Sequence, residues 1–165
     1  MPTAPTVDAR TYAREKVRFH LPPPPNGPSA HPVDIGDRTE AIIVAELVRR
    51  GYRVLRPLSA NQRYDLVLDL GDRFLRVQCK TGRLRNGAIV FSMRSCRSDT
   101  KRTYVRSYSC EEADVFLVYC PETDRIYAVA VGDSGVLNTA SLRVDAPANN
   151  QLKGIRWAVD HELPA

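Results

Sequence analysis

The sequence predicts an α/β domain with a mixed central β-sheet of about four or five strands flanked by helices. Residues 64–80 form two runs of alternating apolar and polar side chains around Gly71-Asp72, which predicts two strands joined by a tight turn. Residues 37–50 carry apolar side chains at the spacing of an amphipathic helix. Residues 114–120 are almost continuously apolar, as expected of a strand buried on both faces.

Length and composition are those of one ordinary soluble domain. The chain has 165 residues, of which 43% are hydrophobic and 26% are charged, so it can bury a sizeable core. No apolar run approaches the length of a membrane span, so we expect no membrane partner. The N-terminus lacks a hydrophobic signal segment, which favours a cytoplasmic location.

The cysteines do not predict a metal site. None of them forms a C-x-x-C pair, and the three histidines all lie outside the cysteine-containing region, which argues against structural zinc. We therefore expect reduced thiols, with Cys79 in the core. The four cysteines are Cys79, Cys96, Cys110 and Cys120.

The predicted helix begins near Asp37 and ends at Gly51. Residues 37–40 read Asp-Arg-Thr-Glu, which has the form of a capping box, and glycine commonly follows a helix. On a helical wheel Glu40 lies within the apolar stripe that also carries Ile43, Val44 and Leu47. An acid at this place either belongs to a site on the sheet or only stabilises the start of the helix.

The predicted hairpin gathers three polar side chains on one face. The leucines of its first run share the core face, which leaves Asp65 on the other face. In the second run Val77 and Cys79 face the core, so Gln78 and Lys80 point the opposite way. A carboxylate, an amide and an ammonium group are therefore expected around one point, where they would make a hydrolytic site.

Further strands are expected on both sides of this hairpin in the sequence. Asn86-Gly87 predicts a turn, and so do residues 121–124. The expected strands are residues 52–57, 88–93, 125–131 and, as a short strand, 141–144.

Asp65 together with Gln78-Cys79-Lys80 resembles the core motif of the PD-(D/E)XK nuclease superfamily. That motif has an acid at the start of one strand, and then an acidic residue, a spacer and a lysine on the next. Residues 64–67, 77–82 and 114–123 resemble, within this superfamily, the homing endonucleases associated with group I introns. The resemblance covers roughly residues 34–131 and implies a restriction-endonuclease-like core.

The resemblance also implies roles for individual residues. Asp65, Gln78 and the backbone carbonyl of Cys79 would bind Mg²⁺, with Mn²⁺ as the alternative ion. Lys80 would position or deprotonate the attacking water, or offset charge on the phosphate. Glu40 would be the helical acid of the catalytic site.

Gln78 departs from the general motif, which has an acid at this position. An amide oxygen can bind Mg²⁺ but brings no charge, so we expect weaker metal binding unless Glu40 contributes through a water molecule. Glutamine at this position is, however, part of the resemblance to the intron-associated enzymes.

Residues 83–106 carry seven basic side chains against one acid, Asp99. A local excess of this kind attracts polyanions, because each phosphate contact releases counterions. The stretch includes the strand at 88–93, which we expect to continue the catalytic sheet, so we predict DNA contacts here; a solvated loop is the alternative. The basic residues are Arg83, Arg85, Arg94, Arg97, Lys101, Arg102 and Arg106.

The function predicted on these grounds is that of a metal-dependent DNA endonuclease, with homing-type, site-specific double-strand cleavage. Its partner would be double-stranded DNA, and we expect a homodimer or homotetramer because one small domain covers a limited length of groove. The alternatives are a junction-resolving or repair nuclease of the same fold and a catalytically inactive DNA-binding module. The phosphate-binding loops of nucleotide-dependent enzymes are absent from the sequence.

Two segments divide the chain. Residues 1–33 are proline-rich, with four consecutive prolines at 22–25 that exclude a helix or a central strand there. We predict a flexible N-terminal arm, which could contact DNA or another subunit. Residues 34–165 are predicted to form the nuclease-like domain.

Overall fold

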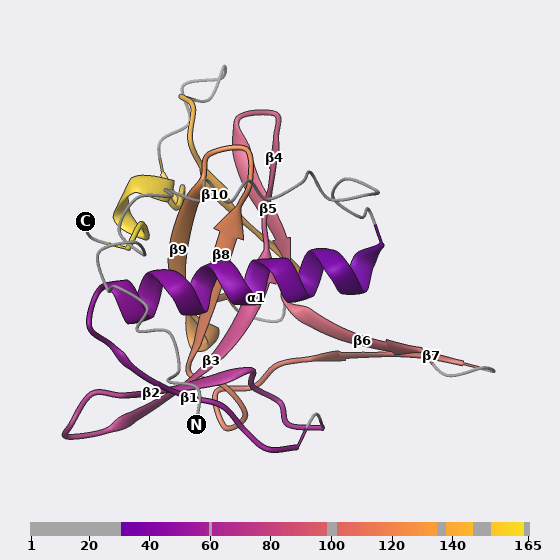
Figure 1. Ribbon diagram of the computed structural model, residues 1–165. Helices are drawn as coiled ribbons and strands as arrows, with labels where there is room; N and C mark the ends of the chain where they lie inside the picture. The colour runs from indigo at the N-terminus through magenta and orange to yellow at the C-terminus, as the bar shows by residue number, and fades with distance from the viewer. Residues whose placement is uncertain (1–30, 60, 99–101, 135–137, 147–152, 164–165) are drawn as a thin grey trace, which may run out of the picture.

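The computed structural model describes residues 31–59, 61–98, 102–134, 138–146 and 153–163 (Figure 1). The predicted arm lies almost entirely outside the described residues. One long helix, α1 (Pro32–Arg49), and ten strands account for most of the described chain. Within the described residues, no helix combines the length and the apolar character needed to cross a membrane.

Helix α1 begins earlier than the sequence analysis predicted. His31 is the N-cap, its ring nitrogen Nδ1 accepts a hydrogen bond from the backbone N–H of Val33 at 3.3 Å, and Pro32 occupies the first turn. Proline is favourable there because the first backbone N–H groups of a helix have no partner inside it. The predicted start near Asp37 is therefore wrong, while Gly51, with a φ of 82°, ends the helix as predicted.

A five-stranded mixed sheet forms the centre of the domain, in the order β1-β2-β3-β8-β9. Strands β3 and β8 are parallel, and the other neighbouring pairs are antiparallel. This confirms the predicted α/β class with a mixed sheet. The strands are β1 (Arg53–Leu55), β2 (Leu66–Asp69), β3 (Phe74–Thr81), β8 (Val115–Cys120) and β9 (Arg125–Ala130).

The remaining strands form two smaller sheets. A three-stranded sheet has the order β10-β5-β4, and β6 pairs with β7 in a two-stranded sheet. A 3-10 turn, η2 (Val131–Ser134), follows β9, and a second, η3 (Ala158–Asp160), lies after β10 near the C-terminus. The strands are β4 (Arg83–Arg85), β5 (Ala88–Ser92), β6 (Arg94–Ser98), β7 (Thr103–Ser107) and β10 (Thr139–Arg143).

The strand at 88–93 does not continue the catalytic sheet, so that expectation is wrong. The chain passes from β3 to β4 at Gly82, and so leaves the five-stranded sheet for the three-stranded one. A Cβ atom at Gly82 would lie 2.7 Å from Ile89 Cγ2 and 3.0 Å from Val118 Cγ1. Only glycine allows this close approach of the two sheets.

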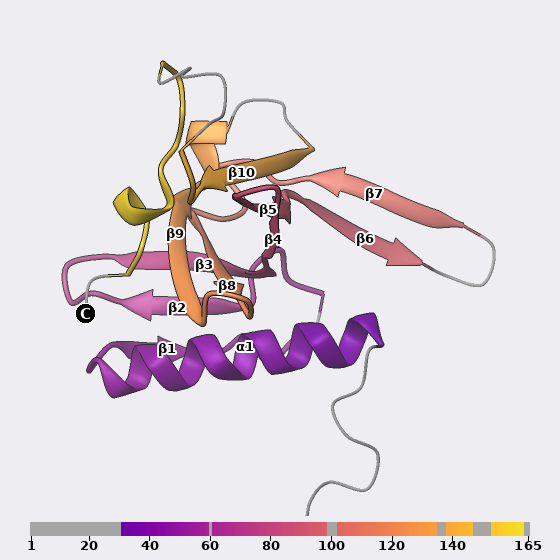
Figure 2. The same cartoon turned by 90° about the horizontal axis from the view of Figure 1, so that it is seen from above.

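Side chains on both faces of the central sheet are buried. On one face, Ile43 and Leu47 of α1 pack with Leu66 and Val77. On the other face Phe116 joins a cluster with residues of β5, β9 and β10, including Ile89, Phe91, Val129 and Leu142. Strand β8 is thus buried on both sides, as predicted, and the second face is covered by strands (Figure 2).

The basic stretch forms a hairpin. Strands β6 and β7 pair in antiparallel register from Arg94↔Ser107 to Ser98↔Thr103. The hairpin projects from the body of the domain, as Figures 1 and 2 show. From Arg94 onward the basic stretch is thus a pair of strands, while its contact with DNA stays a prediction.

Candidate active site

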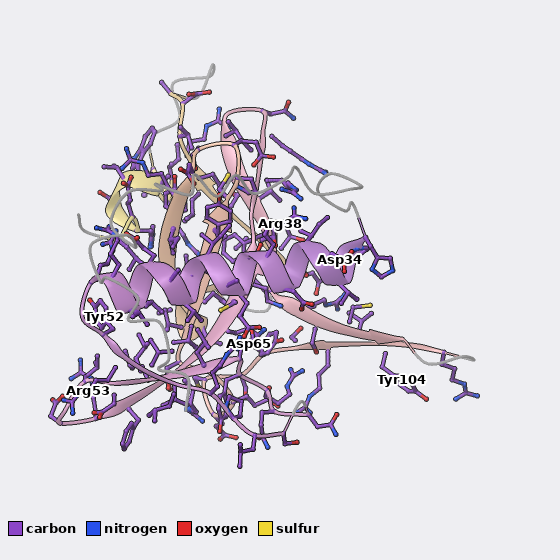
Figure 3. The ribbon with its side chains drawn as sticks, viewed as in Figure 1. Asp34, Arg38, Tyr52, Arg53, Asp65 and Tyr104 are labelled. Carbon is purple, nitrogen blue, oxygen red and sulfur yellow. The ribbon has the colours of Figure 1, made fainter. Side chains whose placement is uncertain are left out.

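The β2–β3 hairpin brings Asp65 and Gln78 together, as strand alternation predicts, and the Cys79 backbone joins them. Lys80, the third side chain expected there, donates its hydrogen bond to the Arg94 carbonyl. Leu66 pairs with Val77, and the backbone N–H of Asp65 donates to the Val77 carbonyl at 2.9 Å. The Asp65 carboxylate oxygen Oδ2 accepts hydrogen bonds from the backbone N–H of Cys79 at 2.8 Å and from Gln78 Nε2 at 2.5 Å. Figure 3 shows the position of Asp65 in the fold.

The Gln78 amide lies between two oxygen atoms. Its nitrogen Nε2 is 2.5 Å from Asp65 Oδ2 and 3.4 Å from the carbonyl oxygen of Cys79. The side chain is buried, with 8% of the residue exposed. The amide nitrogen therefore lies between the carboxylate and carbonyl oxygens, and turning the amide group over would present its oxygen at the same point.

Burial sets the charge state of this cluster. Desolvation raises the pKa of Asp65 above its usual value, and the negative charge of Glu40 adds to the effect. The hydrogen bond from the Cys79 backbone and the charge of Lys80 act in the opposite direction without cancelling it. A cation bound beside Asp65 would therefore relieve an electrostatic cost that the folded chain already bears.

Lys80 follows the cluster on β3 and is largely withdrawn from water. Its ammonium nitrogen Nζ donates a hydrogen bond to the carbonyl oxygen of Arg94 at 3.0 Å. Burial lowers the pKa of Lys80 from 10.5 to about 8, while Asp65 opposes the shift and Arg63 adds to it. At pH 8 a large share of these side chains would be neutral and able to accept a proton.

Glu40 lies near this cluster but contacts a different residue. Its carboxylate forms an ion pair with Arg56. The neighbouring Thr39 is buried, and its hydroxyl lies 2.7 Å from that of Thr81 at the end of β3, which fixes this turn of α1 against the sheet. The charge of Glu40 therefore reaches Asp65 across space, while its direct partner is Arg56.

A second cluster beside Lys80 was not predicted. The Tyr108 ring lies under two cations: Arg63 Cζ is 4.2 Å and Lys80 Nζ is 4.7 Å from its centroid. Arg63 also pairs with Glu112, at 3.2 Å. These residues are far apart in the sequence, and their only sequence signal is the presence of Tyr108 next to a basic stretch.

The predicted DNA-binding arginines differ in their surroundings. Arg83 pairs with Glu122 at 3.9 Å, and Arg106 pairs with Glu112 at 2.5 Å. Arg94 differs, because its Nε is buried without a hydrogen-bond partner among the described residues. Of the others, Arg85 lies on β4, Arg97 on β6 and Arg102 just before β7, while Lys101 lies outside the described residues.

The donor set suits a hard divalent cation. The described residues contain no group of three or more His, Cys, Asp or Glu side chains that could hold a metal. Burial and the charge of Asp65 raise the pKa of the Cys79 thiol, so its sulfur stays protonated and its backbone carbonyl is the available donor. One carboxylate, one carbonyl oxygen and, with the Gln78 amide turned over, its amide oxygen fit Mg²⁺ or Mn²⁺, which retain several further ligand positions for water and phosphate.

A pocket in the described part of the chain lies away from these residues. It has a volume of about 620 Å³ and lies between the C-terminal half of α1, the β8–β9 turn and the C-terminal segment. None of the predicted site residues lines it. A site that cuts a long polymer must be open, so the chemistry of the Asp65 cluster is the better guide to function.

An acid on one strand and a lysine two residues after Gln78 on the next, in a mixed sheet with a helix packed against it, match the class of PD-(D/E)XK nucleases, with glutamine in place of the second acid. A family model described as PD-(D/E)XK endonuclease matches residues 30–164, and the chain belongs to this family. The predicted membership is thereby confirmed, and the protein is a nuclease.

Comparison with solved structures supports the same fold. A bacterial homing endonuclease, I-Ssp6803I, superposes with a TM-score of 0.61 at 22% sequence identity. The match covers 77% of this chain and 85% of the other. No curated protein matches the sequence.

Proposed function

We propose that the protein is a divalent-metal-dependent endodeoxyribonuclease that acts in the cytoplasm and hydrolyses phosphodiester bonds at specific sites in double-stranded DNA. The observation that carries this proposal is the contact of the Asp65 carboxylate and the Cys79 carbonyl with the Gln78 amide, directly before a half-buried lysine, Lys80. Family membership supports the nuclease chemistry, and the fold shared with a homing endonuclease favours homing-type cleavage as the specific form.

Each residue of the site has a task in hydrolysis. Asp65, Gln78 and the Cys79 carbonyl would hold Mg²⁺ or Mn²⁺, which when bound would activate water and offset phosphate charge. Lys80 orients the attacking water or takes its proton, since its pKa is about 8. Glu40 acts at longer range, through its negative charge or through an intervening water molecule.

The β6–β7 hairpin is the proposed DNA-contacting element. It projects from the domain and starts at Arg94. The backbone carbonyl of Arg94 accepts a hydrogen bond from Lys80, which connects the hairpin to the proposed catalytic residues. Arg94 is half-buried, and its positive charge at the root of the hairpin would attract a DNA phosphate, although its Nε is itself buried. The other predicted basic residues would contact phosphates or base edges on either side of Arg94. They are Arg83, Arg85, Arg97, Lys101, Arg102 and Arg106.

Site-specific cleavage of both strands favours a symmetric assembly. One domain of this size covers a limited length of groove, and a two-fold axis would place two sites on opposite strands. We therefore propose a homodimer or homotetramer, whose mass analytical ultracentrifugation or light scattering would determine.

A cleavage assay tests the proposed function. The protein is incubated with supercoiled plasmid and with branched DNA, with Mg²⁺ or with EDTA, beside a Lys80→Ala variant. Mg²⁺-dependent linearisation of plasmid supports site-specific cleavage, whereas cutting confined to branched DNA indicates a junction-resolving or repair nuclease. DNA binding with no cleavage by either protein would indicate an inactive binding module, and equal nicking by both would defeat the assignment of this site.

A further inference from the structure

Both ends of the β6–β7 hairpin hold Lys80. The carbonyl oxygen of Arg94, the first residue of β6, accepts a hydrogen bond from Lys80 Nζ at 3.0 Å. Tyr108 directly follows β7, and its ring centroid lies 4.7 Å from the same ammonium nitrogen. Arg94 pairs with Ser107 across the hairpin, so the two interactions with Lys80 come from neighbouring positions at its root.

The Tyr108 ring is itself held firmly. It meets the ring of Phe116 edge to face, with centroids 5.5 Å apart and an interplanar angle of 84°. Phe116 is fully buried in the core. The Arg63 guanidinium lies 4.2 Å from the Tyr108 ring centroid and pairs with Glu112. The ring is thereby fixed between the core and an ion pair.

Lys80 is half-buried, so its ammonium group has lost part of its hydration and gains from such a contact. An ammonium group has three N–H donors, and the Arg94 carbonyl is its one hydrogen-bond acceptor among the described residues. The face of an aromatic ring carries negative electrostatic potential and attracts a cation, most strongly where water is excluded. The ring therefore replaces part of the hydration that the ammonium loses.

We propose that Tyr108 is a positioning residue for the nuclease reaction, which holds the Lys80 ammonium over its ring face beside the Asp65 cluster. The inference rests on the proposed function, since it takes Lys80 to act in hydrolysis. Tyr108 does not touch the reacting atoms; it acts through Lys80. The same hairpin is proposed to contact DNA. Arg94 at its start and Tyr108 directly after its end also hold Lys80, so a change in the hairpin on DNA binding would change the position of the lysine.

A series of aromatic replacements at position 108 tests the electrostatic attraction separately from ring shape. Tyr108→Phe keeps the ring, and progressively fluorinated phenylalanines keep its size while withdrawing charge from its face. We expect Tyr108→Phe to cleave within roughly 2-fold of wild type, and the single-turnover rate to fall stepwise with fluorination, by roughly 10-fold at three fluorines. Tyr108→Leu should reduce the rate by at least as much.

The effect is expected in the rate of the chemical step and not in DNA binding. DNA affinity and melting temperature should stay close to wild type throughout the fluorinated series. Tyr52→Leu provides the matched control, because Tyr52 lies at the end of α1, away from the hairpin root (Figure 3), and should cleave at the wild-type rate. An equal rate across all the fluorinated variants would overturn the inference.

An NMR measurement separates this inference from the proposed function. A methylene group beside an aromatic face has an upfield-shifted signal, so the Lys80 ε-methylene should be upfield in wild type and Tyr108→Phe and unshifted in Tyr108→Leu. Absence of this shift in wild type would overturn the positioning role. A different outcome would be an upfield shift in wild type together with wild-type cleavage by Lys80→Ala. The contact between Lys80 and Tyr108 would then exist, but the proposed role of Lys80 in hydrolysis would be wrong.

Discussion

The side-chain amide of Gln78 donates a hydrogen bond to the Asp65 carboxylate at 2.5 Å, at the position where the family motif usually has a second acid. The amide satisfies the carboxylate without adding negative charge, so the buried pair is stable in the absence of a cation. An acid in its place would put two carboxylates in direct contact, which favours protonation of one of them or binding of a cation. We therefore expect that glutamine at this position, compared with an acid, gives weaker metal binding and a more stable metal-free fold.

Replacing Gln78 by glutamate should expose this exchange. In EDTA we expect Gln78→Glu to lower the free energy of unfolding by about 1–3 kcal/mol, because the new charge is buried beside Asp65. With Mg²⁺ the variant should bind metal more tightly than wild type and recover stability. Calorimetry with and without Mg²⁺ measures both effects. Gln62→Glu, at an exposed position, is the control; equal behaviour of the two variants would contradict a metal site at Gln78.

Lys80 should make the fold less stable at neutral pH. Its pKa is about 8 in the folded protein against 10.5 without burial, so the unfolded chain binds more protons between these values and stability rises with pH across that window. We expect Lys80→Met to raise the free energy of unfolding by about 1–3 kcal/mol at pH 7. The gain over wild type should shrink from pH 8 to pH 10.5. Urea titrations over this range provide the measurement; a destabilised Lys80→Met protein would show that burial of the ammonium is fully compensated.

The basic residues that lie between β6 and β7 in the sequence should increase DNA affinity by neutralising phosphates. Replacing Lys101 and Arg102 together by alanine should weaken binding and reduce the slope of log K against log salt by roughly 0.9 for each phosphate that the variant no longer neutralises. The matched control is Arg53→Ala with Arg73→Ala on the β1–β2 side, since Arg53 lies at the opposite end of the molecule from Tyr104 of the hairpin (Figure 3). Fluorescence anisotropy over a salt series gives the slopes. Unchanged affinity and slope in the hairpin variant would place the DNA elsewhere.

Replacing Arg94 should change DNA affinity without lowering the stability of the fold. Its Nε is buried without a partner among the described residues, so Arg94→Met removes an unsatisfied polar group and should leave the free energy of unfolding unchanged or raise it by about 1 kcal/mol. The same change should weaken DNA binding by roughly 10-fold if a phosphate is its acceptor. Thermal unfolding and anisotropy on the same samples measure both. A clear loss of stability with unchanged DNA affinity would show that Arg94 is structural.

The cluster on β2 and β3 could be predicted from the sequence because strand alternation decides which side chains share a face. Asp65 and Gln78 meet as that alternation requires, and the Gly71 turn brings the two strands together. The Cys79 backbone enters the cluster through its own hydrogen bond to Asp65, which alternation of side chains does not predict. Strand β8 was equally clear, since an unbroken apolar run has only a fully buried place in such a fold.

Other features depend on interactions between distant segments. The passage of the chain between sheets at Gly82 results from the close approach of Ile89 and Val118, which no local pattern reveals. The ring of Tyr108 beside Lys80 depends on the path of the whole hairpin between them. The start of α1 was misplaced because residues 37–40 have the form of a capping box, whereas His31 caps the helix and Pro32 occupies its first turn, where proline is tolerated.

The most direct test of a metal-dependent site at Asp65 compares the cleavage and DNA binding of wild type with those of Asp65→Asn. Asparagine keeps an acceptor for the Cys79 backbone N–H but removes the one carboxylate in direct contact with the Gln78 amide. With Mg²⁺ and saturating protein we expect the single-turnover cleavage rate to fall by at least about 100-fold, while DNA affinity stays within roughly 2-fold of wild type. Cleavage by Asp65→Asn at the wild-type rate, with the same dependence on Mg²⁺, would contradict the site.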